Sequence, residues 1–351
     1  MQATLIHDIQ TQFHAFVDQI ADGSRVGVLC HSDADGIAAG AILARTFGKL
    51  GHTAITDVTG KGESAWSPEV RERLVAAELD ALIVTDLGSR GDPLLDGVPT
   101  LLLDHHRPIG VPSGATLLTG YGHEPTPTSG LLAYWCAEAV SDASDLDWIA
   151  AVSLLSDIGD NAPFDLLAEA KARYKATPLR DATTLLNAPR RSATGDARPA
   201  LDLLLKANDP REVVRGSEPE VAQLKAAKTE VNQAFAEAKK ASPKFSGNVA
   251  IIKIDTPCQI HPLIAQIWRT RLPKYIVFGT NTGYLPGRVN FSARSSKDVN
   301  LLDFLREHAP SDPGMWYGLG HDQASGGSLS YAQWNEFVTG LGFGSEVMVE
   351  V

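Results

Sequence analysis

Four short apolar runs in the first half of the chain each end at aspartate or histidine. The runs are VGVLC, ALIVT, TLLL and VSLLS, and the residues that follow them are His31, Asp33 and Asp35; Asp86; Asp104, His105 and His106; and Asp157. Short runs of this composition are typical of parallel strands that are buried on both faces. In an open α/β sheet, ligands bind beyond the carboxyl ends of the strands. We therefore expect an α/β fold in which these polar side chains meet in one crevice.

Five carboxylates and three imidazoles in one crevice would repel one another unless cations bind between them. Oxygen ligands with a few imidazoles suit Mg²⁺, Mn²⁺ or Zn²⁺, and the absence of thiolates at these positions argues against a structural zinc site. A carboxylate shared by two ions about 3.5–4 Å apart is the usual arrangement for in-line displacement at phosphorus. The pattern therefore predicts a pair of divalent metal ions.

Each aspartate taken alone has a simpler interpretation as a turn residue or a helix cap. Asp86 in DLGSRG and Asp157 in SDIGD would both fit that interpretation if they were isolated. Four such sites, each at the end of an expected strand or helix, are hard to explain as independent caps. For Asp157 we expect the preceding segment to be a helix, with a strand as the alternative.

The same residues resemble a known family. The segments HSDADG, VTDLG, LLLDHHRP and SLLSDIGD resemble the four ordered motifs of the DHH phosphoesterase superfamily. The segment GLGHDQASGG resembles the GGH-type motif of the DHH-associated domain found in the RecJ-like branch. The HxDxDG form of the first motif is more similar to RecJ-type nucleases than to the branch that cleaves very short RNA and cyclic dinucleotides.

This resemblance implies a role for each motif residue. One metal ion would be held by His31, Asp33 and Asp86, and the second by Asp35, Asp86, His105 and Asp157, with Asp86 bridging the two. His106 would contact the scissile phosphate and help to protonate the leaving oxygen, and Asp104 would orient the histidines. Mn²⁺ is the implied activator, and the ligand types do not separate it from Mg²⁺.

In the second half of the chain, the resemblance assigns substrate binding to Arg294, Gly320 and His321. The residues agree, because arginine makes bidentate contacts with phosphate and a glycine-rich loop before a helix lets backbone N–H groups approach one. Leu319 stands where the family commonly has glycine, so the loop shape can differ. A plain glycine turn is the alternative for this segment.

Composition limits the partners. The 351 residues and 44% apolar content suit two domains with buried cores. Three scattered cysteines fit a reducing cytoplasm, and the first residues predict an amphipathic helix and not a signal peptide. The formal net charge of −11 argues against coating long nucleic acid and favours a short or small anionic substrate. No apolar run is long enough to cross a membrane.

The order of apolar and polar segments predicts three regions. Residues 1–190 form a parallel-sheet domain with the metal site, 191–246 a helical linker, and 247–351 a smaller α/β domain that binds substrate. Two lobes joined by a linker would close over substrate in a cleft between them. Ser129 in PTPTSG is expected to cap the following helix, with a phosphate contact as the alternative. Arg190 and Arg191 are expected to be solvated, with nucleic-acid contact as the alternative.

The predicted function is a Mn²⁺-dependent phosphodiesterase that removes mononucleotides from short or single-stranded nucleic acid. The alternative within the same chemistry is a phosphodiesterase or phosphatase for small nucleotides: cyclic or linear dinucleotides, or 3′-phosphoadenosine 5′-phosphate. A manganese pyrophosphatase fits less well, because such enzymes resemble a different C-terminal domain. A non-catalytic scaffold would have lost metal ligands, and this chain retains a candidate at every ligand position. The sequence leaves the oligomeric state open.

Overall fold

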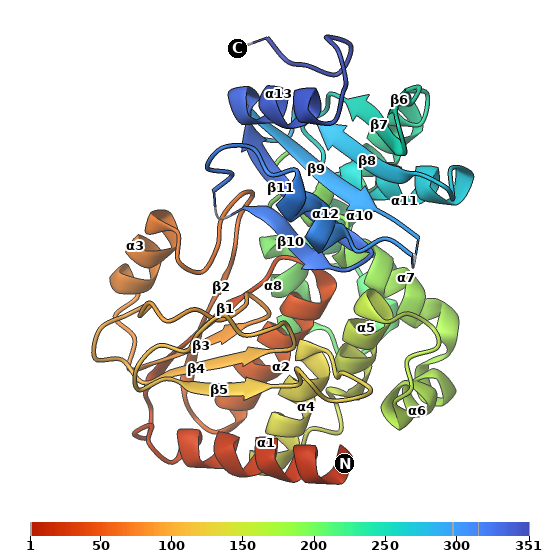
Figure 1. The fold of residues 1–351 in the computed structure, drawn as a ribbon. Helices are drawn as coiled ribbons and strands as arrows, with labels where there is room; N and C mark the ends of the chain where they lie inside the picture. Colours follow the sequence, from red (N-terminus) through yellow and green to blue (C-terminus); the bar gives the residue numbers. More distant parts are fainter. Residues whose placement is uncertain (1, 297, 315, 351) are drawn as a thin grey trace. The chain divides into compact units, whose positions relative to one another are not determined.

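A five-stranded parallel sheet forms the centre of the first half of the chain (Figure 1). Its strands are β1 (Arg25–Cys30), β2 (Thr53–Val58), β3 (Ala81–Thr85), β4 (Thr100–Asp104) and β5 (Thr116–Thr119). Their order across the sheet is β2-β1-β3-β4-β5, and every neighbouring pair is parallel. Because the chain moves from β1 outward to β2 and then back to β3, the topological switch point lies between β1 and β3, where ligands bind in such sheets.

The structure is a computed structural model that describes residues 2–296, 298–314 and 316–350. It divides into two units. The first consists of Met1–Arg190 and Asp196–Ala226, and the second of Arg191–Gly195 and Ala227–Val351. The region predicted as a linker therefore contributes to both units, and we describe each unit separately.

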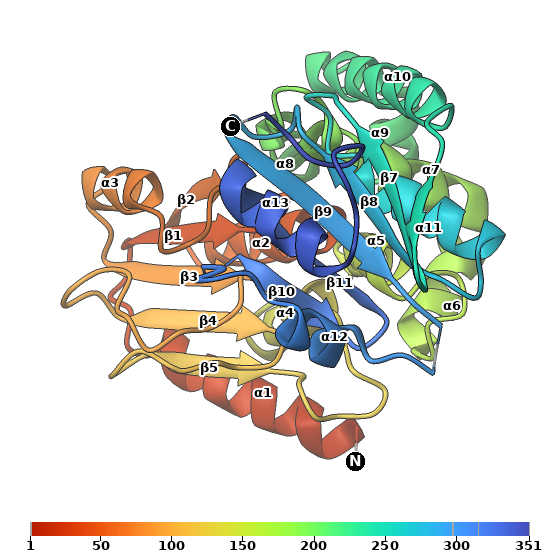
Figure 2. The ribbon, with the colours of Figure 1, turned by 45° about the horizontal axis from the view of Figure 1, so that its top comes forward.

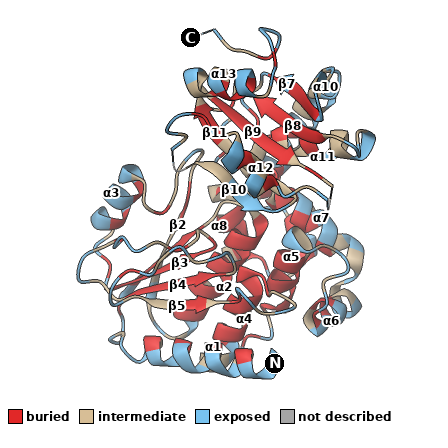
Figure 3. Ribbon diagram, in the orientation of Figure 1, coloured by how far each residue is buried: buried red, intermediate tan, exposed pale blue. Residues whose placement is uncertain are grey.

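Helices cover both faces of the parallel sheet. The three inner strands of this sheet are largely buried, as the red ribbon in Figure 3 shows. Alternate strand residues point to opposite faces, so Val28 and Cys30 join one apolar cluster while Leu29 joins the other. The larger cluster contains side chains from most of the helices of this unit, and the smaller one is closed by α3 (Pro68–Ala76). The other helices are α1 (Gln2–Val17), α2 (Ala34–Lys49), α4 (Ser129–Val140), α5 (Asp147–Asp157), α6 (Asp165–Tyr174), α7 (Ala176–Leu186), α8 (Arg198–Lys206) and α9 (Pro210–Arg215).

The second unit is built on a six-stranded mixed sheet with the order β10-β11-β9-β8-β7-β6 (Figure 2). The strands are β6 (Lys244–Ser246), β7 (Val249–Ile254), β8 (Ile276–Asn281), β9 (Arg288–Arg294), β10 (Tyr317–His321) and β11 (Ala324–Ser330). Only β7 and β8 pair in parallel among the described strands of this sheet. One face packs on α12 (Leu301–Glu307) and α13 (Tyr331–Gly340), and the other on α11 (His261–Arg271) and the end of α10 (Pro219–Ala238).

The predicted fold class is confirmed: a parallel-sheet α/β unit is followed by a second unit with its own mixed sheet. The expected glycine-rich loop before a helix is wrong, because GLGHDQASGG forms most of the hairpin of β10 and β11. The glycines are needed there for close packing. A Cβ on Gly326 would lie 2.7 Å from the Phe291 carbonyl oxygen, and one on Gly327 would lie 2.9 Å from the Phe291 ring. Within the described part of the chain, no helix has both the length and the apolar character required to cross a membrane.

Candidate metal centre

The six predicted metal ligands all lie in the first unit, at the carboxyl edge of its sheet. His31 follows β1, Asp86 follows β3, and His105 follows β4. Asp33 caps the N-terminus of α2 by accepting a hydrogen bond from Gly36 N–H at 3.0 Å, and Asp35 lies in the first turn of that helix. Asp157 is the last residue of α5, so the expectation of a helix for this segment is confirmed.

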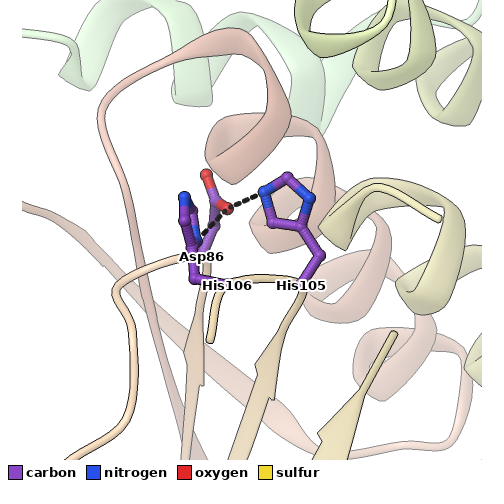
Figure 4. Close-up of side chains that lie close together, drawn as sticks. All are labelled: Asp86, His105 and His106. Carbon is purple, nitrogen blue, oxygen red and sulfur yellow. Dashed lines mark ion pairs between the residues drawn. The ribbon is translucent and has the colours of Figure 1, made fainter. Parts of the chain in front are cut away.

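These side chains form groups that could hold metal ions. One group is His31, Asp33 and Asp86, and another is Asp35, His105 and Asp157; in each, one ligand atom per residue lies within 4.8 Å of the others. A third group, Asp86 with His105 and His106, overlaps both (Figure 4). The structure therefore brings together every residue that the sequence proposed as a ligand.

Asp86 belongs to the first group and also approaches His105 of the second. Its Oδ2 atom is 3.3 Å from His31 Nδ1, and its Oδ1 atom is 3.3 Å from His105 Nε2. The residue has a φ of 62°, in the left-handed region that aspartate tolerates better than most residues. The carboxylate, only 4% exposed, is thus in a position to bridge two ions.

Glycine is required beside His31. A Cβ on Gly36 would lie 2.5 Å from the His31 Cβ and 2.6 Å from its carbonyl oxygen. Any larger residue would push α2 away from the end of β1. Gly36 therefore allows three potential ligands from one short segment to reach the same site.

The carboxylates have unusual proton affinities. Burial, together with the charges of Asp86 and Asp157, raises the pKa of Asp35 well above its ordinary value. Burial and the charges of Asp33 and Asp86 raise the pKa of Asp157 to about 6. Both shifts favour the neutral carboxyl, because burial and the neighbouring negative charges disfavour the ionised form.

The pKa values of two imidazoles are raised as well, which favours their charged form. Burial opposes the charged form of His105, but hydrogen bonding to Asp86 and the charge of Asp35 outweigh it and raise the pKa of His105 to about 10. The pKa of His31 is also raised, because Asp33 and Asp86 outweigh its burial. Protonated imidazoles thus hold the positive charge that divalent cations would supply.

The donor set fits such cations. The Nε2 atom of His105 is buried and has no hydrogen bond of good geometry to any described residue, although Asp86 Oδ1 lies 3.3 Å away and Asp157 Oδ2 3.6 Å away. A buried nitrogen of this kind is costly unless it has a partner, and a metal ion would provide one. Aspartate oxygens and imidazole nitrogens are ligands that Mn²⁺, Mg²⁺ and Zn²⁺ accept.

Asp104 and His106 form a pair beside these groups. The Asp104 carboxylate is 2.8 Å from His106 Nδ1 and accepts hydrogen bonds from the backbone N–H groups of His106 and Gly88. Burial opposes the change, but bonding to His106 lowers the pKa of Asp104, and Asp104 in turn raises the pKa of His106. Asp104 therefore fixes the His106 ring, whose side chain remains 48% exposed.

Sequence reasoning missed three neighbours of the cluster. Ser129 was expected to cap α4, and this is wrong: Thr128 is the N-cap residue, and the Ser129 hydroxyl donates to Asp86 Oδ1 at 3.0 Å. Asn187 accepts a hydrogen bond from Ala34 N–H and donates one to the Ser156 hydroxyl, so it connects the start of α2 to the end of α5. Arg190, expected on a solvated face, is only 21% exposed and lies 3.9 Å from Asp33.

The three predicted substrate-binding residues lie in the second unit. His321 of β10 pairs with Ala324 of β11, which pairs with Arg294 of β9, so Arg294 and His321 lie in one row across the sheet, and Gly320 lies in the next row. Residues in one row point to the same face, with Arg294 and His321 about 10 Å apart at the backbone. Gly320 has a φ of 125°, and a Cβ there would lie 2.4 Å from the Ala324 carbonyl oxygen. Only glycine fits beside His321.

Comparison with known proteins identifies the fold. No protein-family model and no curated protein matches the sequence. Among solved structures, RecJ from Thermus thermophilus in complex with Mn²⁺ matches with a TM-score of 0.71 and 21% identity, over 96% of this chain and 54% of that one. The chain thus spans about half the length of that RecJ.

Two further structures agree. An exonuclease RecJ bound to manganese matches with a TM-score of 0.65 and 21% identity, over 95% of this chain and 93% of that one. The DHH domain of a member of a family of ribosomal proteins matches with a TM-score of 0.69 and 14% identity, over 97% of this chain and 90% of that one. The chain therefore has a RecJ-like α/β fold.

Proposed function

We propose that this protein is a divalent-metal-dependent phosphodiesterase that releases mononucleotides from short or single-stranded nucleic acid. The observation on which this rests is the position of Asp86, whose two carboxylate oxygens approach imidazoles of two different ligand groups. Such a shared carboxylate is what two-metal hydrolysis of phosphate esters requires. The RecJ-like fold supports the same chemistry.

His31, Asp33 and Asp86 would hold one ion, and Asp35, Asp86, His105 and Asp157 the other. When bound, such a pair lowers the pKa of a water molecule and neutralises charge on the phosphoryl oxygens. Solved RecJ structures contain Mn²⁺ or Mg²⁺. We propose Mn²⁺ as the activating ion, with Mg²⁺ as the alternative.

His106 would deliver a proton to the leaving oxygen. Its Nδ1 atom is taken up by Asp104, which leaves Nε2 for the substrate. Because Asp104 raises the pKa of His106, the imidazole is more often protonated near neutral pH than an ordinary histidine. A proton donor held by a carboxylate in this way is typical of general acids.

Arg294, Gly320 and His321 of the second unit would hold the substrate phosphates. The Arg294 Nη1 atom donates to the Ser292 hydroxyl at 2.8 Å and to the Ala293 carbonyl oxygen at 2.9 Å, which keeps the guanidinium close to its own strand. A guanidinium held in this way can bind phosphate with little loss of side-chain entropy. We also propose that the protein acts in the cytoplasm, because its three cysteines are unpaired and buried.

The net charge of −11 favours a second candidate, a phosphodiesterase or phosphatase for small nucleotides. An acidic protein binds a polyanion poorly, whereas a small substrate interacts mainly with the metal ions and a few side chains. The same site chemistry serves both functions. Only the size of the substrate separates them.

The test is a substrate panel with the full chain. Oligonucleotides of several lengths, labelled at either end, are compared with cyclic dinucleotides, linear dinucleotides, 3′-phosphoadenosine 5′-phosphate and pyrophosphate. Each is assayed with Mn²⁺, with Mg²⁺ and with EDTA. We expect mononucleotides from oligonucleotides in Mn²⁺ and no product in EDTA. Turnover of the cyclic dinucleotides alone would reject the nuclease, and no turnover of any substrate would reject the phosphoesterase in favour of a scaffold.

A further inference from the structure

The N-terminal end of α4 contacts the two carboxylates at the centre of the metal cluster. The N–H groups of Ser129 and Gly130 donate to Asp35 Oδ2 and Oδ1 at 3.0 and 2.7 Å. The Ser129 hydroxyl donates to Asp86 Oδ1 at 3.0 Å. Ser129 and Asp35 are fully buried and Asp86 nearly so, so these hydrogen bonds are shielded from water.

The Ser129 hydroxyl distinguishes the two oxygens of Asp86. Oδ1 receives that hydrogen bond and faces His105, whereas Oδ2 faces His31. The terminal torsion of aspartate is broad, so a carboxylate does not hold one rotation by itself. A donor on one oxygen selects the rotation in which each oxygen faces a different ligand group.

Close packing holds this helix end in place. A Cβ on Gly130 would lie 2.5 Å from the Ser153 Cβ and 3.3 Å from Asp35 Oδ1. The Thr128 hydroxyl accepts the hydrogen bond from Leu131 N–H and also contacts the Ser153 hydroxyl. Because Thr128 caps the helix, the Ser129 hydroxyl is left to bind Asp86.

We propose that Ser129 is a positioning residue that orients Asp86 for bridging two metal ions. The inference rests on the proposed function and deepens it, because it states that Ser129 affects one of the two proposed metal sites more than the other. The Ser129 hydroxyl binds Oδ1 of Asp86, the oxygen that faces His105, and His105 belongs to the group with Asp35 and Asp157. Removal of this hydroxyl leaves the backbone hydrogen bond to Asp35 in place. It therefore weakens the ion at the Asp35, His105 and Asp157 group, through Asp86, more than the ion held by His31 and Asp33.

The experiment compares Ser129→Ala with Ser153→Ala in the full chain. Both variants delete one fully buried hydroxyl beside α4, but the hydroxyl of Ser153 contacts Thr128 and no metal-ligand carboxylate among the described contacts. Mn²⁺ is titrated into each protein while calorimetry measures affinity and electron paramagnetic resonance distinguishes isolated ions from spin-coupled pairs. Thermal unfolding of the metal-free proteins shows whether either variant has lost its fold.

In Ser129→Ala we expect the coupled-pair signal to require about 10- to 100-fold more Mn²⁺, while one ion still binds nearly as in the unaltered protein. Ser153→Ala should retain the pair at the original concentration. Equal pair formation in both variants, or an equal loss at both sites, would overturn the inference. If the unaltered protein forms no Mn²⁺ pair and hydrolyses nothing, the proposed function itself fails, which is a different result.

Discussion

Metal binding by this protein should release protons, because the cluster holds charged imidazoles when no metal is present. The pKa of His105 is raised to about 10 and that of His31 is also raised. A metal ion binds only the neutral imidazole. Near pH 7, removing the proton from His105 costs about 4 kcal/mol, since its pKa lies about three units higher and each unit corresponds to about 1.4 kcal/mol.

Two imidazoles that lose their protons give a release of about two protons per protein near pH 7, and the apparent binding constant for the pair should then rise about a hundredfold per pH unit. Below about pH 6, Asp157 is protonated as well and should add about one more proton. Asp35, whose pKa is raised in the same direction, would increase the number further.

Calorimetry of Mn²⁺ binding in buffers with different ionisation enthalpies counts these protons directly. His105→Gln is the matched variant, because it keeps a polar side chain but has no proton to lose, and it should release about one proton fewer. An affinity that does not depend on pH between about 6 and 8, with no proton release, would refute the assignment of charged imidazoles to the cluster.

Three further variants test the site. Asp86→Asn keeps the side-chain shape and a residue that tolerates positive φ, so the fold should persist while Mn²⁺-dependent hydrolysis falls about a thousandfold or more; retained turnover would contradict the bridging role. Asp104→Asn should move the alkaline limb of the rate profile to lower pH, because the pKa of His106 falls when its partner loses its charge; an unchanged profile would argue against His106 as the acid. Gly36→Ala should lower both thermal stability and Mn²⁺ affinity, since its Cβ would overlap His31, and normal Mn²⁺ binding would show that the segment can adjust.

The fold, and the meeting of the six candidate ligands at one place, could be predicted because each motif follows an apolar run. Buried parallel strands are short, nearly continuous apolar runs, and the carboxyl ends of such strands meet at one edge of the sheet. Asp157 was harder, since the apolar segment before it could have been a strand or a helix, and the structure has the helix α5 there. The order of the motifs made the RecJ-like resemblance specific even though no family model matches.

The errors arose where backbone packing decides. The glycines near His321 suggested a loop, yet they occur in paired strands because the backbone lies against Phe291. Ser129 follows a threonine that can cap a helix equally well, and local sequence does not tell which hydroxyl does so. Asn187 and Arg190 lie far along the chain from the motifs, and only folding brings them to α2.

By itself, the sequence determined which residue types end the strands, and hence that acids and imidazoles would gather at one edge of a parallel sheet. Short apolar runs bounded by glycine and polar residues indicate buried strands locally, so the ends of the strands could be deduced from the sequence. Tertiary structure alone decided that Asp86 turns one oxygen toward His31 and the other toward His105, with Ser129 bound to the second. That orientation depends on contacts of Asp86 with residues that lie 19, 43 and 55 positions away along the chain, which no local pattern specifies.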